Sequence, residues 1–223
     1  MNTKNKILNM TMVALFCALS YICVFTFRIH VGFLTFDIKD TIMAIGSMIF
    51  GPIAALVMIL VTTLLELVTV SGTGFYGWLM NFISSAAFVM PIAIAYRLRK
   101  NVYSAILGLL GSIVLMTAAM MAANILITPL YMGVTRDVVV SMIPKTLLPF
   151  NLTKAVLNAG LVLLLYKPIS QALHAAGIHG KSTYQKFRFT PATVAVFMIG
   201  VALTVAALLY FFLAMEGTLT FGK

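Results

Sequence analysis

Charged residues are scarce in this chain, and acidic residues are the scarcest. Only 9% of its 223 residues are charged, with five Asp and Glu against fifteen Lys and Arg. A soluble domain has about a quarter of its residues charged. Because 62% of the residues are hydrophobic and the mean hydropathy is +1.08, the composition predicts an integral membrane protein with one membrane domain and no sizeable soluble domain.

The sequence also lacks the motifs of several catalytic classes. It contains no Walker A sequence, no Gly-x-Ser-x-Gly and no His-Glu-x-x-His. Its acidic residues form no cluster suited to magnesium, and its histidines show no ligand spacing. Cys17 and Cys23 both lie in the first apolar run, where we expect small buried residues rather than a disulfide. We therefore expect no enzyme activity, no metal and no cofactor.

Several apolar stretches are predicted to be membrane helices, for which a full span needs about 20 residues, although the second of them is shorter. They cover residues 7–27, 40–51, 52–70, 78–96, 103–128, 148–166 and 192–214. Pro52 separates the second from the third, because proline is favoured in a first helical turn, and Pro129 is expected to end the fifth. The prediction is an all-α membrane protein with a six-helix bundle in 1–170, a cytoplasmic linker over 171–190, and a seventh transmembrane helix and tail over 191–223.

The orientation follows from lysine and arginine, which concentrate in cytoplasmic loops. With a cytoplasmic N-terminus, the inner segments hold basic residues and no acids: Lys4, Lys6, Arg97, Arg99, Lys100, Lys167, Lys181, Lys186 and Arg188. The loops 28–40, 71–77 and 130–147 then lie outside. This asymmetry accounts for the net charge of +10 without nucleic acid as a partner, and it predicts a multi-pass protein of the cell membrane.

The sixth apolar stretch contains a lysine where a membrane helix ordinarily has leucine. Lys154 lies near the outer end of this stretch, with Asn151 and Asn158 three and four residues away on the same helix face. A long lysine side chain can extend to the interface from this depth. The stripe of Asn, Lys and Asn instead favours the wall of a polar pocket, because intramembrane ionisable residues usually face a protein interior or cavity.

Other polar residues are expected near the same outer end. Glu66, Asn81 and Asn124 come from three further helices. Each has a structural alternative, a hydrogen bond to a neighbouring helix, and Glu66 is also a possible salt-bridge partner of Lys154. Thr35, Asp37 and Lys39 lie in the first outer loop, and together these residues predict an outward-facing polar pocket.

Aromatic residues in the outer loops are suited to cover a flat apolar ligand. The candidates are Phe33, Phe36, Phe75, Tyr76 and Trp78. The alternative is an interfacial aromatic belt. In the first helix Ala14 and Ala18 have the small-xxx-small spacing of closely packed helices, although ordinary packing also uses alanine.

Several segments resemble one family. They are "FLTFDIKD" (33–40), "FGPIAALV" (50–57), "GWLMNFISSAAFVMPIAIAYR" (77–97), "NILITPLYMG" (124–133) and "LLPFNLTKAVLNAG" (147–160). The chain resembles the substrate-binding S components of energy-coupling factor (ECF) vitamin transporters, most of all the riboflavin-specific type. Leu-Pro-Phe-Asn-x-x-Lys is the most specific of the motifs, and the resemblance covers most of residues 7–170.

The resemblance implies high-affinity binding and uptake of a vitamin, with the first outer loop as a lid and hydrogen bonds from Asn124, Asn151 and Lys154. The full set of expected ligand residues is Asn124, Asn151, Lys154, Asn81, Thr35, Phe36, Asp37, Gly77 and Asn158. It also implies a membrane coupling subunit, which contacts Ala14 and Ala18, and two ATPase subunits. The alternatives are another vitamin, such as pantothenate or folate, and a membrane enzyme or assembly protein. The chain departs from the family in its seventh apolar stretch and in the charged "FDIKD" of the lid.

Overall fold

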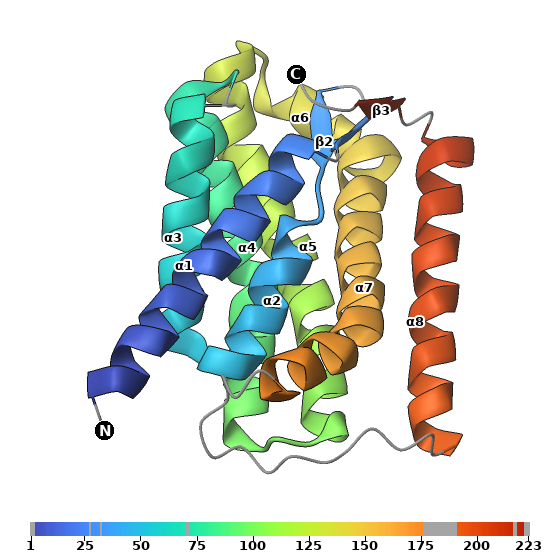
Figure 1. Cartoon of the computed structure of the whole chain (residues 1–223). Coiled ribbons are helices and arrows are strands. Elements are labelled where there is room, and N and C mark those ends of the chain that lie inside the picture. Colours follow the sequence, from blue (N-terminus) through green and yellow to red (C-terminus); the bar gives the residue numbers. More distant parts are fainter. Residues whose placement is uncertain are drawn as a thin grey trace.

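The computed structural model describes residues 3–26, 28–31, 33–69, 72–175, 191–215 and 218–220. It is a bundle of long helices with a small sheet at one end, opposite the end where the first helix begins (Figure 1). The helices are α1 (Thr3–Thr26), α2 (Lys39–Phe50), α3 (Pro52–Thr69), α4 (Gly74–Leu98), α5 (Val102–Met132), α6 (Arg136–Met142), α7 (Leu148–Ala175) and α8 (Pro191–Leu209). Two π-helical turns adjoin these helices. η1 (Ile143–Leu147) leads directly into α7, and η2 (Tyr210–Ala214) directly follows α8.

Among the residues that the structure describes, six helical segments are long and apolar enough to cross a membrane, and the last of them is Val194–Ala214. This confirms the all-α membrane class and the additional C-terminal helix. α2 has 12 residues, which is shorter than a span needs. It instead begins inside the bundle, below the sheet (Figure 1).

The main apolar core lies where α2 packs against α1, α3, α4 and α7. Met43, Ile45, Met58, Phe88 and Ile92 are fully buried there. α4 and α5 approach closely at Gly108, where an ideal Cβ would lie 2.8 Å from the Ile92 Cα. The close packing of small and flexible apolar residues fixes the position of α2, whose first turn carries charged residues.

Residues 28–36 contain a β-hairpin, which the sequence analysis did not predict. β1 (Arg28–Val31) pairs antiparallel with β2 (Leu34–Phe36), and β1 also pairs with β3 (Thr218–Thr220). The sheet order is β2-β1-β3. Ile29, Val31 and Phe36 are buried, so the hairpin has one apolar face that packs against the protein.

Several predicted boundaries were wrong. Pro129 lies inside α5, which continues to Met132 and ends at Gly133 with φ of 66°. Most of the predicted loop 130–147 is helical, as α6 and η1. α4 begins at Gly74, because part of the glycine-rich stretch forms its first turn.

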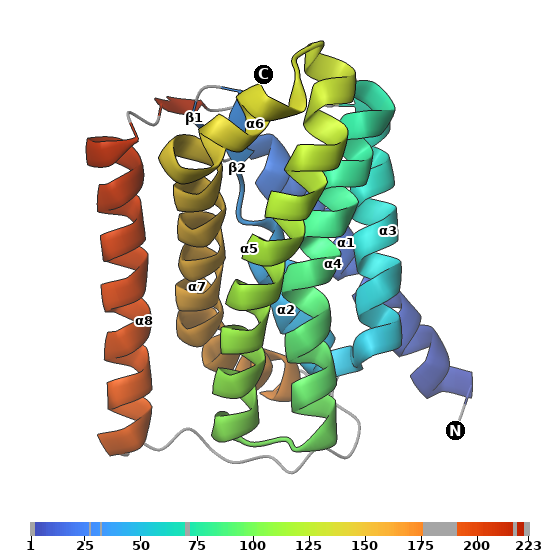
Figure 2. The same cartoon turned by 180° about the vertical axis from the view of Figure 1, so that it is seen from behind.

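α8 packs against α7 and lies on the opposite side of the bundle from α3, as Figures 1 and 2 both show. Residues 171–175 of the predicted linker continue α7, and 176–190 lie outside the described residues. The predicted helix over 192–214 corresponds to α8 and η2.

Candidate functional site

A cluster of ionisable side chains is buried where the start of α2 meets α3 and α7. Lys39 Nζ lies 2.7 Å from Glu66 Oε2 and 3.7 Å from Asp37 Oδ2, and Lys154 Nζ lies 3.7 Å from the same Asp37 oxygen. Asp40 interacts electrostatically with this group. These five residues are at most 5% exposed, and buried charges must be paired or hydrogen-bonded.

The cluster has one more carboxylate than it has ammonium groups, because Asp37, Asp40 and Glu66 face Lys39 and Lys154. Neutral polar groups complete part of its hydrogen bonding. Asn81 Nδ2 donates to Glu66 Oε2 at 2.9 Å, and Ser85 Oγ donates to Asp40 Oδ1 at 2.6 Å. We refer below to Asp37, Lys39, Asp40, Glu66 and Lys154 as the ionic cluster.

Hydrogen-bonding capacity remains in the ionic cluster. Within the described part of the chain, the buried atoms Glu66 Oε1 and Asp40 Oδ2 have no hydrogen-bond partner. The contact of Lys154 with Asp37 at 3.7 Å is an ion pair and is too long for a hydrogen bond, so its three N–H donors retain capacity. Unpaired buried polar atoms are costly, and a ligand with both donors and acceptors would satisfy these.

Asn158 has a structural role that its position in the polar stripe did not reveal. Its Oδ1 accepts hydrogen bonds from the Thr41 backbone N–H at 3.1 Å and from Thr41 Oγ1 at 2.7 Å. Its Nδ2 donates to the Lys154 carbonyl at 3.0 Å. The first N–H groups of a helix lack partners within it, so Asn158 on α7 caps α2 across the bundle.

Asn124 and Asn151 are buried, and their side chains hydrogen-bond within their own helices and η1. Asn124 Nδ2 donates to the Met120 carbonyl at 2.7 Å, while its Oδ1 accepts from Thr128 Oγ1 at 2.9 Å. Asn151 Nδ2 donates to the Leu147 carbonyl at 2.8 Å. Asn151 lies one turn before Lys154 on α7, and Asn124 is on α5; no hydrogen bond joins either to the ionic cluster among the described residues.

The remaining predicted ligand residues lie at the edge of this site. Thr35 Oγ1 is 3.2 Å from His30 Nδ1 across the hairpin. The Phe36 ring packs on Phe211, with centroids 5.3 Å apart, and so faces the C-terminal helix. Gly77 is half-buried in the first turns of α4.

The outer aromatic residues of α4 form a group of their own. The Trp78 ring lies 5.3 Å from Phe75 and 5.9 Å from Phe82. Trp78 Nε1 is buried without a hydrogen-bond partner among the described atoms. Trp78 is three residues before Asn81, on the same helix face, so this donor lies on the side of α4 that meets Glu66.

Sequence analysis named four members of the ionic cluster, Asp37, Lys39, Glu66 and Lys154, as polar residues near the outer end, but it did not predict that Lys39 pairs with Glu66 and Asp37. Lys39 was placed in an outer loop, but it is the first residue of α2 and is 1% exposed. Asp40, Thr41 and Ser85 were not proposed at all. The only available signal was that "FDIKD" is unusually charged for this chain and directly precedes an apolar run.

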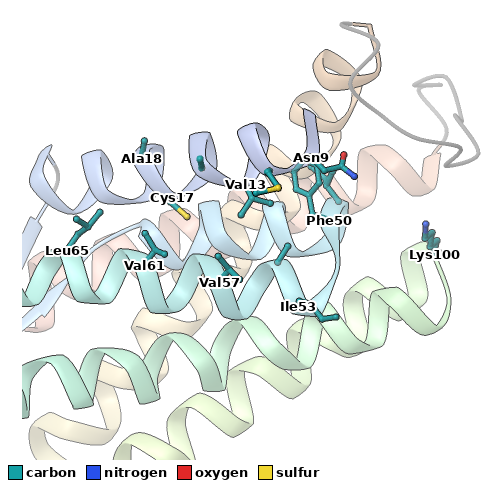
Figure 3. A pocket seen from close by; sticks show the side chains of 14 residues that line it. Asn9, Val13, Cys17, Ala18, Phe50, Ile53, Val57, Val61, Leu65 and Lys100 are labelled. Atoms are coloured by element: carbon teal, nitrogen blue, oxygen red, sulfur yellow. The ribbon is translucent and has the colours of Figure 1, made fainter. Parts of the chain in front are cut away.

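A second feature lies on the membrane-facing side of the bundle. A groove of about 780 Å³ runs between α1 and α3 and is lined by Ala14 and Ala18 (Figure 3). Its other walls are largely apolar, including Val13, Val57 and Val61, and Lys100 lies at one end. The alanines keep the α1 side shallow, so another helix can approach closely.

Comparisons with known proteins agree with this architecture. Residues 8–170 match the family described as "ECF transporter, substrate-specific component". The chain is 25% identical over 147 residues to "Riboflavin transporter RibU" from Staphylococcus aureus (strain TCH60), covering 63% of this chain and 77% of that protein. A solved structure described as "Structure and mechanism of the S component of a bacterial ECF transporter" is similar with a TM-score of 0.65 and 23% identity, over 77% of this chain and 99% of that one.

Proposed function

The chain belongs to the family of substrate-specific components of ECF transporters, and from this premise we propose that the vitamin it binds is riboflavin. Members of this family are substrate-binding membrane subunits of transporters and not enzymes. The riboflavin transporter of Staphylococcus aureus, to which the chain is 25% identical, supports this ligand. The observation that carries the proposal is the ionic cluster with unused donors and acceptors on Lys154, Glu66 and Asp40.

Riboflavin offers the matching groups. Its ring carbonyls and ring nitrogens accept hydrogen bonds, which suits the ammonium of Lys154. Its ring N–H and the hydroxyl groups of its side chain donate, which suits Glu66 Oε1 and Asp40 Oδ2, the buried oxygens without a partner among the described residues. We propose that the Trp78 indole and the amides of Asn81, Asn124 and Asn151 complete the site beside Asp37.

Charge separates riboflavin from two of the alternatives. Pantothenate and folate are anions at neutral pH, whereas riboflavin is neutral. The ionic cluster holds three carboxyl groups against two ammonium groups, and each ammonium already faces a carboxyl, so an added anion would find no unpaired cation in this region of low dielectric. The surplus carboxyl group would favour a cationic vitamin, which is therefore the second candidate.

We propose a cytoplasmic N-terminus, which places the sheet and the ionic cluster toward the outside. Supporting this, α4 ends and α5 begins at the end of the bundle where α1 starts (Figure 1), and that connection carries Arg97, Arg99 and Lys100. We further propose that the groove lined by Ala14 and Ala18 receives a helix of the membrane coupling subunit, whose two ATPase partners supply the energy. α8 lies on the other side of the bundle and leaves this groove open.

A binding screen on the purified full-length protein tests the ligand. The protein, washed free of ligand in detergent, is titrated with riboflavin, thiamine, pantothenate and folate, and ligand carried through purification is identified by mass spectrometry. We expect quenching of flavin fluorescence with saturation at one riboflavin per chain, and no binding of the two anions. Tight thiamine binding without riboflavin binding would overturn the proposal in favour of the cationic candidate.

A further inference from the structure

We propose that the C-terminal extension, defined as α8, η2 and β3, is a latch that holds the β1–β2 hairpin closed over the ligand site. The extension begins at Pro191, beyond residue 170 where the family match ends. The latch depends on the proposed function in one respect only, which is the identity of the ligand that the hairpin covers. The contacts that carry it lie entirely within this chain.

The extension is seated on α7 by direct contact between helix backbones. An ideal Cβ on Gly160 would lie 2.7 Å from Thr204 Oγ1 and 3.1 Å from the Gly200 carbonyl oxygen. An ideal Cβ on Gly200 would in turn lie 3.1 Å from the Gly160 carbonyl oxygen. A side chain at position 160 would require Thr204 to shift, and one at position 200 would press on the Gly160 carbonyl and on Leu164, so the two glycines let α8 pack closely on α7.

From this seat the extension contributes to a second apolar core. Its members are Ile29, Val31 and Phe36 of the hairpin, Phe150 and Leu157 of α7, and Ala207 and Phe211 of the extension. Phe211 is fully buried, with ring centroids 5.3 Å from Phe36 and 5.6 Å from Phe150. The buried face of the hairpin therefore packs on α7 and the extension, separately from the main core.

The extension also binds the hairpin through its backbone. β3 pairs with β1 in an antiparallel register that places Thr218 opposite His30 and Leu219 opposite Ile29. An isolated two-stranded hairpin is at best marginally stable, and a third strand with an apolar face adds stability. β3 also covers an edge of β1 that would otherwise present unpaired backbone groups.

The same contacts reach the ligand site through sequence neighbours. Phe36 directly precedes Asp37, whose carboxylate faces both lysines of the ionic cluster, and Phe150 directly precedes Asn151. Asp37, Asn151 and Lys154 are 5%, 2% and 4% exposed. A ligand reaches side chains buried to this degree only when a covering element moves, and the hairpin is the cover next to Asp37.

Adjacent phenylalanines provide a matched test in the full-length protein. Phe211→Ala removes the ring that joins the hairpin to α7, whereas Phe212→Ala makes the same change at a side chain that is 37% exposed. Riboflavin release is followed by recovery of flavin fluorescence after dilution or competition. We expect Phe211→Ala to release riboflavin about tenfold faster or more, since a buried aromatic makes contacts whose loss is worth at least that factor, without slowing binding. Phe212→Ala should match the unmodified protein.

Amide hydrogen exchange of residues 28–36 gives a second readout that needs no ligand. Phe211→Ala and Thr220→Pro, which removes a backbone donor of β3 opposite Arg28, should each accelerate this exchange while α4 and α5 keep their protection. If release and exchange in both variants equal those of Phe212→Ala, the latch is wrong. If the unmodified protein fails to bind riboflavin, the proposed function fails alone, and exchange in the hairpin still decides the latch.

Discussion

Lys39 and Glu66 form an ion pair in the middle of the bundle, with Lys39 Nζ 2.7 Å from Glu66 Oε2 and both residues at most 3% exposed. The pair joins the first residue of α2 to α3. Since desolvating two charges costs several kcal/mol per ion, the pair is retained only where it is well paired or used. Ionisable residues inside a membrane span are expected to be functional, and the Lys39–Glu66 pair borders the proposed ligand site.

Removing both partners of this pair should destabilise the protein by less than the sum of the two single removals. Lys39→Met leaves Glu66 buried without its cation, while Asp37 keeps Lys154; breaking comparable pairs costs about 3–5 kcal/mol. Lys39→Met combined with Glu66→Gln should recover about 1–3 kcal/mol relative to the sum of the single changes. Thermal and denaturant unfolding of the ligand-free protein in detergent measures this cycle. Lys145→Met, at an exposed lysine, is the control, and strictly additive effects would contradict the pairing.

Lys154→Ala should weaken riboflavin binding. A hydrogen bond to a charged group is worth about 1.5–3 kcal/mol, so the dissociation constant should rise by about tenfold or more. Lys145→Ala removes a lysine that is exposed at η1 and should leave affinity unchanged. The measurement is a fluorescence titration with riboflavin. Equal riboflavin affinities for the two variants would show that Lys154 does not bind the ligand and only pairs with Asp37.

Asn158 should affect stability through Thr41. Asn158→Ala removes the acceptor for two donors of Thr41, at 3.1 and 2.7 Å, and leaving buried donors unpaired costs about 1–3 kcal/mol. Thr41→Val removes only the hydroxyl donor and should lower the free energy of unfolding by less than Asn158→Ala does. Thr41→Ser keeps the hydroxyl and should have a free energy of unfolding close to that of the unmodified protein. Unfolding of the ligand-free protein ranks the three variants. A reversed order would mean that Asn158 does not cap α2.

Hydropathy was sufficient to predict the long helices, because a membrane span must be continuously apolar and satisfy its own backbone. Pro52 was correctly identified as the start of α3. Pro129 did not end α5, since a membrane helix tolerates proline where neighbours satisfy the freed backbone groups. The resemblance identified the family, which the match over residues 8–170 confirmed.

The pairing within the ionic cluster was beyond local reasoning because the partners are far apart in sequence. Lys39 and Glu66 are separated by 27 residues, and Thr41 and Asn158 by 117. No spacing rule relates such positions, and a charged pentapeptide before an apolar run is ordinarily a solvated loop. The hairpin was missed for a related reason: β1 and β2 have 4 and 3 residues, and their pairing with β3 joins the two ends of the chain.

The groove between α1 and α3 should be needed for transport and not for ligand binding. Ala14 and Ala18 are exposed and line it, so Ala14→Leu and Ala18→Leu add bulk on the path of an approaching helix. We expect these variants to lose co-purification with the coupling subunit and to lose riboflavin uptake by whole cells. The riboflavin affinity of the isolated subunit should stay within about twofold of the original, which is far below the 1.4 kcal/mol that corresponds to a tenfold change in affinity.

Ala122→Leu is the matched control for this face, because Ala122 is also exposed on a membrane-spanning helix, α5, but does not line the groove. It should leave co-purification, uptake and affinity unchanged. If the groove variants assembled and transported normally, the coupling subunit would have to bind elsewhere on the bundle. If they instead lost riboflavin binding, the α1 face would be part of the ligand site, which is incompatible with an ionic cluster enclosed by α2, α3 and α7.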